Sequence, residues 1–282
     1  MNKAPAPILA DVLKERVIPA LARYRWPAVA AYYVRKAADQ QLRRRFVSSY
    51  DRTSNGEWWL LDTVGPSVRR AFDIGANEGQ WTAALLDRSP QIEHVVCWEP
   101  GATAFARLRA CLGENPRVEL VQAAVSDRAE LEAEFFESDG TQDSSMFATA
   151  AGDSHATIIP VVQLDEEIER LGAEVVDLVK IDAEGADLMV LRGARRSLQS
   201  QRIRLVQFEY HRPWLHAGAT MHAALEFLAA CGYDTYLLNG SGLCRFDRNR
   251  APEIFHYMNF VAVAQSHRDF VAFDVQPDPL WG

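Results

Sequence analysis

The residues best suited to chemistry are acids that stand at the ends of short apolar segments. Asp182 closes the segment 175–181, and Glu209 closes the segment 203–208, with His211 two residues beyond it. If these segments are neighbouring parallel strands, their tips lie about 5 Å apart. The three side chains would then converge on one site. Asp182 or His211 could take the proton of a hydroxyl substrate, or all three residues could hold a divalent cation such as Mg²⁺ that acidifies the hydroxyl.

A glycine-containing loop follows another apolar segment. The segment 71–74 contains Asp73 near its end and leads into a turn with Gly75, Asn77 and Gly79. Glycine lets the backbone turn sharply and approach a ligand closely, because it has no Cβ. A carboxylate at this strand tip would repel the pyrophosphate of a dinucleotide, whereas it suits the amino group and sulfonium of S-adenosylmethionine. We therefore predict that these four residues bind S-adenosylmethionine.

Two further positions complete the predicted cofactor site. Glu99 ends the apolar segment 94–98, as an acid does at the ribose position of nucleotide-binding sheets. A carboxylate there can accept hydrogen bonds from both ribose hydroxyls. The turn 123–127 follows the third apolar segment, and its small residues Ala124 and Ser126 permit close approach of a ring. We predict that Glu99 binds the ribose and that Ala124 and Ser126 lie beside the adenine.

The elements that must position these residues alternate between strand and helix patterns after residue 70. Such alternation is typical of an α/β sheet with parallel strands. The helix 166–171 is expected to have Asp165 as its N-cap. Glu184 and Asp187 are interpreted as first-turn acids of a helix, favoured by its dipole. We predict strands at 71–74, 94–98, 118–122, 132–137, 158–162, 175–181, 203–208, 233–238 and 257–263, and helices at 80–88, 104–112, 166–171, 186–198 and 221–231.

The composition is that of an ordinary globular protein with an uneven charge. The chain has 282 residues, is 48% hydrophobic and carries a net charge of −8, which argues against non-specific nucleic-acid binding. The sequence shows no transmembrane segment and no secretory signal. Its four cysteines are scattered without a metal or redox pair, so we expect a cytoplasmic location.

Residues 1–56 are predicted to form an N-terminal helical extension, divided at Pro19 and Pro27. Residues 1–45 hold ten Lys/Arg and three Asp/Glu, so this segment is +7 and the remainder is −15. The basic residues are interpreted as a solvated surface, with contact to an anionic substrate or a membrane surface as the alternative. The aromatic residues are interpreted as packing, with a lid or a homodimer contact as the alternative.

Several of these motifs together resemble the FkbM family of S-adenosylmethionine-dependent methyltransferases. The resemblance runs from about Asn55 to Phe260. It implies a Rossmann-like class I sheet of seven strands, mostly parallel, whose last strand is antiparallel. It also implies O-methylation of a small-molecule hydroxyl acceptor, such as a polyketide, a sugar or a glycolipid. The motifs that carry it are Phe72–Gly79, Trp98–Pro100, Ala124–Asp127, Leu164–Asp165, Val179–Gly185, Leu191–Ala194 and Phe208–Glu209.

Two other functions agree with part of the pattern. An NAD(P)-dependent Rossmann oxidoreductase shares the strand–turn–helix, but Asp73 counts against it, and Tyr32 and Lys36 precede the glycine loop instead of following it. A non-catalytic S-adenosylmethionine-binding module would keep the fold and lose the chemistry, although Asp182 and Glu209 argue against this. We expect the methyltransferase domain to span residues 57–270 and a C-terminal tail to span 271–282. We also expect the polar loop 138–154 to help select the acceptor.

Overall fold

The computed structural model describes residues 24–46, 49–137 and 155–281, and the chain divides into two compact units, Met1–Arg45 and Phe46–Gly282. In the first unit, helix α3 (Arg25–Arg45) is continuous, and Pro27 lies in its first turn. A missing N–H costs no hydrogen bond there, so Pro27 does not divide this helix. Pro19 and the loop 138–154 lie outside the described residues. The boundaries at residues 56 and 270 stay predictions.

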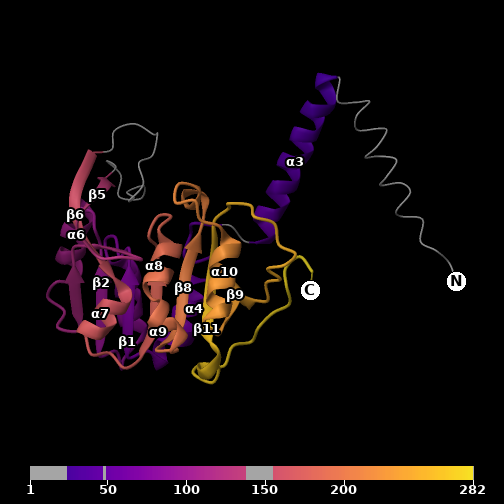
Figure 1. Ribbon diagram of the computed structural model, residues 1–282. Coiled ribbons are helices and arrows are strands. Elements are labelled where there is room, and N and C mark those ends of the chain that lie inside the picture. The colour runs from indigo at the N-terminus through magenta and orange to yellow at the C-terminus, as the bar shows by residue number, and fades with distance from the viewer. Residues whose placement is uncertain (1–23, 47–48, 138–154, 282) are drawn as a thin grey trace. The chain divides into compact units, whose positions relative to one another are not determined.

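The second unit is built on an eight-stranded sheet of order β10-β9-β11-β8-β7-β1-β2-β3 (Figure 1). Strands β3, β2, β1, β7 and β8 run parallel, whereas β11 runs antiparallel to β8 and β9. The predicted mostly parallel sheet with an antiparallel last strand is confirmed. It has one strand more than predicted, because β10 forms a hairpin with β9. The strands are β1 (Arg70–Ile74), β2 (His94–Trp98), β3 (Val118–Val121), β7 (Val176–Ile181), β8 (Ile203–Tyr210), β9 (Tyr233–Asn239), β10 (Gly242–Cys244) and β11 (Met258–Ala264).

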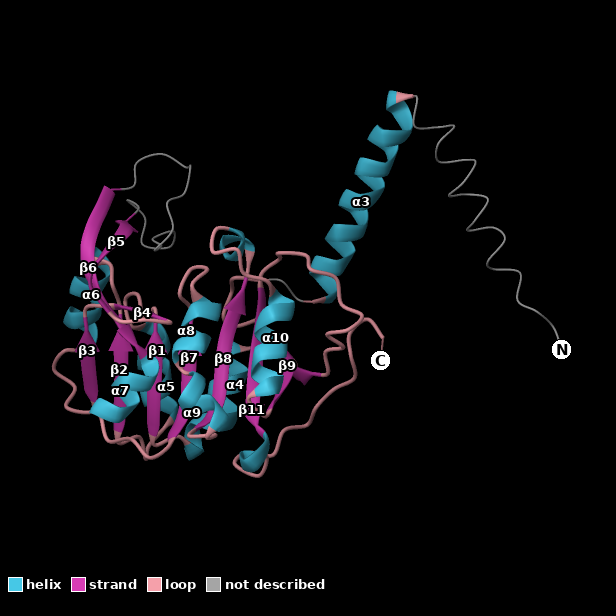
Figure 2. Ribbon diagram, in the orientation of Figure 1, coloured by secondary structure: helices cyan, strands magenta, loops and turns pink. Residues whose placement is uncertain are grey.

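A small sheet of order β4-β6-β5 stands beyond the β2–β3 side of the large one (Figure 2). It consists of β4 (Ala124–Ser126), β5 (Glu130–Glu137) and β6 (His155–Gln163). The prediction of a turn at 123–127 was therefore wrong. Residues 124–126 are extended because they pair in parallel with residues 161–163 of β6, a partner far away in the sequence.

Helices cover both faces of the large sheet (Figure 2). On one face, α4 (Glu57–Val64), α5 (Gln80–Arg88) and α6 (Ala102–Leu112) share a buried core with side chains of β1, β2, β7 and β8. On the other face lie α7 (Leu164–Arg170), α8 (Asp187–Gly193), α9 (Arg195–Gln199) and α10 (Met221–Ala230). Short 3-10 helices occur at η2 (Gly65–Ser67), η3 (Arg212–Leu215) and η4 (Gln265–His267). In the part of the chain that the structure describes, no helix is both long and apolar enough to cross a membrane.

Two helix predictions were wrong in detail. The helix expected over 186–198 is broken at Ala194 into α8 and α9. Asp165 lies in the first turn of α7, and it does not cap that helix. Its carboxylate accepts the backbone N–H groups of Arg196 and Ser197, each at 2.8 Å, at the start of α9. The side chain therefore satisfies the N-terminal amides of a helix that tertiary packing brings beside it.

Candidate active site

The loop between β1 and α5 lies against the end of β7. Ile74 pairs with Ile181 in the parallel ladder, and the Asp182 N–H donates to the Ile74 carbonyl at 3.0 Å. Gly75 has a φ of 73°, and a Cβ added to it would stand 1.8 Å from the Asp182 carbonyl oxygen. Only glycine fits this close approach in this conformation. The glycine loop and the predicted catalytic strand end are thus in direct contact.

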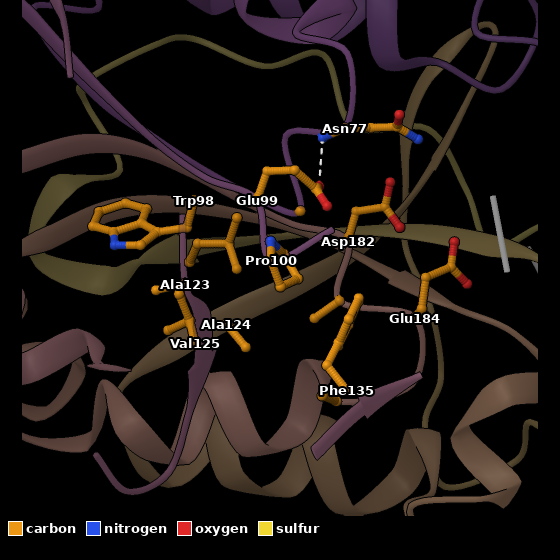
Figure 3. A pocket seen from close by; sticks show the side chains of 14 residues that line it. Asn77, Trp98, Glu99, Pro100, Ala123, Ala124, Val125, Phe135, Asp182 and Glu184 are labelled. Atoms are coloured by element: carbon orange, nitrogen blue, oxygen red, sulfur yellow. Dashed lines mark hydrogen bonds between the residues drawn. The ribbon is translucent and has the colours of Figure 1, made fainter. Parts of the chain in front are cut away.

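A first cavity opens between this loop and the strand ends. One side is apolar and includes Trp98, Ala124 and Val125, whereas Asp182 and Glu184 lie on the opposite side (Figure 3). A cofactor with a flat aromatic ring at one end and positive charge at the other matches this division. S-adenosylmethionine has both features.

Glu99 lines the first cavity and is itself held in place by backbone donors. Its Oε2 accepts the Asn77 N–H at 2.8 Å (Figure 3). Its Oε1 accepts the Gly101 N–H, also at 2.8 Å. Burial raises the pKa of Glu99 to about 7, and the two backbone donors oppose this shift. Each carboxylate oxygen has a further lone pair available, so Glu99 can still accept hydrogen bonds from a ribose.

The predicted cofactor residues divide into those on the cavity wall and those behind it. Gly75, Asn77, Glu99 and Ala124 line the cavity, and they join residues from three different segments. Three others are not among the lining residues. Gly79 precedes the first residue of α5 as its N-cap, Ser126 is buried in β4, and Asp73 is fully buried behind the wall.

Asp73 is paired with a lysine that sequence analysis had not considered. Its Oδ2 accepts the Thr82 hydroxyl at 2.7 Å, and its Oδ1 lies 3.4 Å from the Lys180 ammonium. The same ammonium lies 3.2 Å from Asp182 Oδ2 and donates to the Gly75 carbonyl at 3.0 Å. Lys180 thus connects the glycine loop, β1 and the end of β7. Because it compensates the charge of Asp73, it weakens the argument that Asp73 alone repels a pyrophosphate.

Lys180 is 2% exposed, and it stays charged because acids surround it. Burial lowers the pKa of its ammonium, but the carboxylates of Asp182 and Asp73 outweigh burial and raise that pKa above its ordinary value. Glu209 and Glu57 act in the same direction.

A second cavity adjoins the first and gathers all three predicted catalytic residues. Asp182, Glu209 and His211 line it, since Ile181 pairs with Phe208 and the next residue of each strand points to the same edge. Asn77, Asp182 and Glu184 line both cavities. The two hollows therefore share a wall, and a molecule in one can face a molecule in the other.

Further residues that sequence analysis missed hold Glu209 in position. The Tyr257 hydroxyl donates to Glu209 Oε1 at 2.7 Å and accepts from the side-chain amides of Asn55 and Asn259, at 3.2 and 3.3 Å. The Asn55 amide also donates to Glu57 Oε1 at 2.6 Å. Asn55 and Glu57 lie at the start of the family resemblance, and this position could have indicated that they belong to the site. Nothing near Tyr257 in the sequence indicated that β11 would bring it here.

The acids of the second cavity repel one another in a buried setting. Burial raises the pKa of Glu209 well above its ordinary value, and the neighbouring charges of Asp182 and Glu57 raise it further. Burial also raises the pKa of Glu57, whereas the nearby Arg52 guanidinium opposes this shift. The Arg52 Nε lies 3.5 Å from Glu57 Oε2. This cavity favours a neutral or cationic guest over an anionic one.

The glycine loop and the strand ends that carry Asp182 and Glu209 lie within one stretch of sequence. The model of the methyltransferase FkbM domain matches residues 73–235, more than half of the chain. The chain belongs to the FkbM methyltransferase family. The predicted resemblance is confirmed, and membership favours methyl transfer over the oxidoreductase alternative.

Several individual proteins are similar to this chain. The FkbM chain is 27% identical over 185 residues to the 2-O-methyltransferase NoeI of Sinorhizobium fredii, covering 60% of this chain and 73% of that protein. A crystal structure of Methyltransferase FkbM from Methylobacillus flagellatus shares 17% identity at a TM-score of 0.45, covering 69% of this chain and 44% of that one. An O-methyltransferase from Bacillus cereus in complex with SAH shares 12% identity at a TM-score of 0.37, covering 73% and 78% of the two chains.

The geometry of the FkbM site does not suit the predicted metal alternative. Asp182 is directed to Lys180 at 3.2 Å, Glu209 to Tyr257 at 2.7 Å and His211 to Glu184 at 3.6 Å. The described residues contain no group of three or more His, Cys, Asp or Glu side chains placed to hold a metal ion. The three residues therefore share a cavity without forming a ligand set for a metal ion.

Glu184 is not a first-turn acid, because α8 begins three residues later at Asp187. It has a φ of 46°, a left-handed conformation that costs a residue with a side chain about 1–3 kcal/mol. Asn77, with a φ of 49°, is similar, and both residues line both cavities. Such strain is concentrated at functional sites. Asp187 does lie in the first turn, and its carboxylate accepts the Gly185 N–H at 3.2 Å.

Proposed function

We propose that this protein is an S-adenosylmethionine-dependent O-methyltransferase that acts on a hydroxyl of a small natural product or a sugar moiety. S-adenosylmethionine occupies the first cavity and the acceptor occupies the second. The observation that carries this proposal is the wall that the two cavities share, formed by Asn77, Asp182 and Glu184. In-line transfer needs the methyl carbon of one ligand to face the oxygen of another, and adjoining cavities provide that arrangement.

The chemistry of the first cavity supports S-adenosylmethionine as the methyl donor. Glu99 accepts the ribose hydroxyls, and the adenine packs beside Ala124 and Val125. The acidic end, with Asp182 and Glu184, receives the sulfonium and the amino group, because carboxylates stabilise nearby positive charge. Asp73 and Gly79 act from behind the wall by holding Lys180 and the start of α5.

The second cavity supports a polyhydroxylated acceptor. Glu57 and Glu209 supply carboxylate oxygens that accept hydrogen bonds from hydroxyls. The rings of Tyr50 and Tyr257 also line this cavity, with centroids 4.4 Å apart, and they offer an apolar surface to the C–H groups of a sugar ring. The relative NoeI is named a 2-O-methyltransferase, which favours oxygen as the methylated atom.

In the mechanism that we propose, the acceptor oxygen attacks the methyl carbon as the carbon–sulfur bond breaks. The sulfonium becomes a neutral thioether, and the hydroxyl proton passes to His211. The Glu184 carboxylate, 3.6 Å from His211 Nε2, stabilises the imidazolium that forms. Asp182, at the junction of the cavities, accepts a hydrogen bond from a neighbouring hydroxyl of the acceptor and so aligns the attacking oxygen with the methyl group.

Two measurements test this function. Calorimetry should show binding of S-adenosylmethionine and S-adenosylhomocysteine in preference to NAD(P)H. Mass spectrometry of a panel of glycosides and polyketide alcohols should detect a methyl ether on at least one acceptor. Binding without methyl transfer to any acceptor would indicate a non-catalytic module, and preference for a nicotinamide cofactor would refute the proposal.

A matched pair of variants tests the role of Asp182. Asp182→Asn should lower turnover even when S-adenosylmethionine is saturating, because the amide keeps the size of the side chain and loses the charge of the carboxylate. Glu114→Gln makes the same chemical change at an exposed position of the same unit and should leave turnover unchanged. Equal turnover in the two variants would remove Asp182 from the mechanism.

A further inference from the structure

Helix α3 presents a stripe of large apolar side chains to solvent. Trp26, Val29 and Tyr33 follow one another at the i, i+3 and i+7 spacing, and they are 65%, 53% and 64% exposed. At 3.6 residues per turn, this spacing places all three on one side of the helix. No residue of α3 is buried. An exposed stripe of this kind marks an interaction surface.

A row of basic residues runs beside the stripe. Arg25, Lys36 and Arg43 are separated by 11 and 7 residues, so they lie within about 20° of one another around the helix axis. Helix α3 as a whole contains six Lys/Arg residues and one acidic residue, Asp39. Its net charge is therefore +5, in a chain whose net charge is −8. The positive charge is therefore concentrated on the helix that also exposes the apolar stripe.

We propose that α3 binds the surface of an anionic phospholipid bilayer. The helix lies in the plane of the membrane, with Trp26, Val29 and Tyr33 at the boundary between headgroups and acyl chains. The basic row contacts the anionic headgroups, and the long stems of its side chains lie along the apolar boundary. Trp and Tyr favour this boundary because their rings are apolar with a polar edge.

Charge and apolar area together favour a membrane over two other partners. A second copy of α3 would bring +5 against +5, and like charges at close range repel. Nucleic acid would satisfy the basic row but leave the apolar stripe in water. An anionic bilayer satisfies both, since it offers negative headgroups and an apolar layer a few ångströms apart.

Vesicle flotation of the full chain tests this proposal. We expect the protein to float with vesicles that contain 30% phosphatidylglycerol and to be released from them by high salt. With vesicles of pure phosphatidylcholine, we expect it to remain in the bottom fraction. Replacing Arg25, Lys36 and Arg43 with Gln should lower the partition coefficient about a hundredfold, because each basic residue at an anionic surface contributes about 1 kcal/mol. The control replaces the exposed Arg109, Arg192 and Arg245 with Gln, the same loss of charge on the other unit.

A second variant tests the apolar stripe separately. Trp26→Gln with Tyr33→Gln should abolish flotation while circular dichroism stays unchanged, since Gln is at least as good a helix former as Trp or Tyr. The proposal is overturned if the chain does not float with anionic vesicles, or if the basic-row variant and its control bind equally. A concentration-dependent dimer that this double variant abolishes would identify the stripe as a subunit contact instead. Neither acceptor nor cofactor is present, so the outcome is independent of the proposed methyl transfer.

Discussion

Replacing Lys180 with Met removes the positive charge that joins three elements of the site. The ammonium lies 3.4 Å from an oxygen of Asp73 and 3.2 Å from one of Asp182, and each pair is worth about 5 kcal/mol at an effective dielectric constant near 20. The desolvation cost of the three groups offsets much of this gain. Removing one partner of a buried pair typically costs about 3–5 kcal/mol, because the other charge is left uncompensated. We expect Lys180→Met to lower the free energy of unfolding by that amount at pH 7.5.

The pH dependence of this loss has a definite sign. Burial has already raised the pKa of Glu209, so the folded state binds more protons than the unfolded state above the unfolded value near 4.3. Stability therefore falls as pH rises through this range. The Lys180 ammonium lowers the pKa of Glu209, so without Lys180 this pKa rises further and the fall in stability extends to higher pH. The deficit of Lys180→Met should be smaller at pH 5 than at pH 8.

Urea unfolding followed by tryptophan fluorescence measures this loss, because Trp81, Trp98 and Trp214 are buried. Lys36→Met makes the same change on the exposed surface of α3 and should stay within about 0.5 kcal/mol of the parent. Asp73→Asn combined with Lys180→Met should recover part of the loss, since both charges of one pair are then absent. A deficit below 1 kcal/mol for Lys180→Met, equal at both pH values, would refute the reasoning.

Three further predictions concern the cavities. Glu99→Gln should weaken S-adenosylmethionine binding about tenfold or more in calorimetry, as expected for losing a hydrogen bond to a charged group. Because burial raises the pKa of Glu99 to about 7, cofactor affinity of the parent should also fall below pH 7, and the Gln variant should lose this dependence. His211→Ala should lower kcat by about 10²–10⁴, with cofactor affinity retained. Treatment with EDTA, followed by addition of Mg²⁺, should leave turnover unchanged; loss and recovery of activity would restore the metal alternative.

The order of strands and helices was largely predictable, because periodicity is a local property. The runs that end at Ile74, Trp98, Ile181 and Phe208 are apolar and bounded by polar residues, and each proved to be a strand or part of one. Errors arose where the partner is remote. Residues 124–126 have no local reason to be extended, and only pairing with β6 makes them a strand. The role of Asp165 likewise could not be predicted locally, because it depends on the position at which α9 begins.

The site was predictable in its strand ends but not in its charge balance. Asp182, Glu209 and His211 could be grouped from the sequence, since parallel strands share one edge for their carboxyl ends. The role of Lys180 could not be predicted from the sequence. It depends on the ion pairs with Asp73 and Asp182, which only the folded structure shows. Tyr257, which holds Glu209, immediately precedes the antiparallel β11 and lies 48 residues away from Glu209 in the sequence.

The sequence by itself determined the glycine loop, the acids at the strand ends and the family, because these depend on residue type and short spacing. Tertiary structure decided what the acids do. It placed Asp73 behind the cavity wall with Lys180, and it placed Glu184 on the wall instead of in a helix. The physical reason is that the effect of a carboxylate depends on burial and on charges within a few ångströms. Those neighbours are set by packing between distant segments and not by adjacent residues.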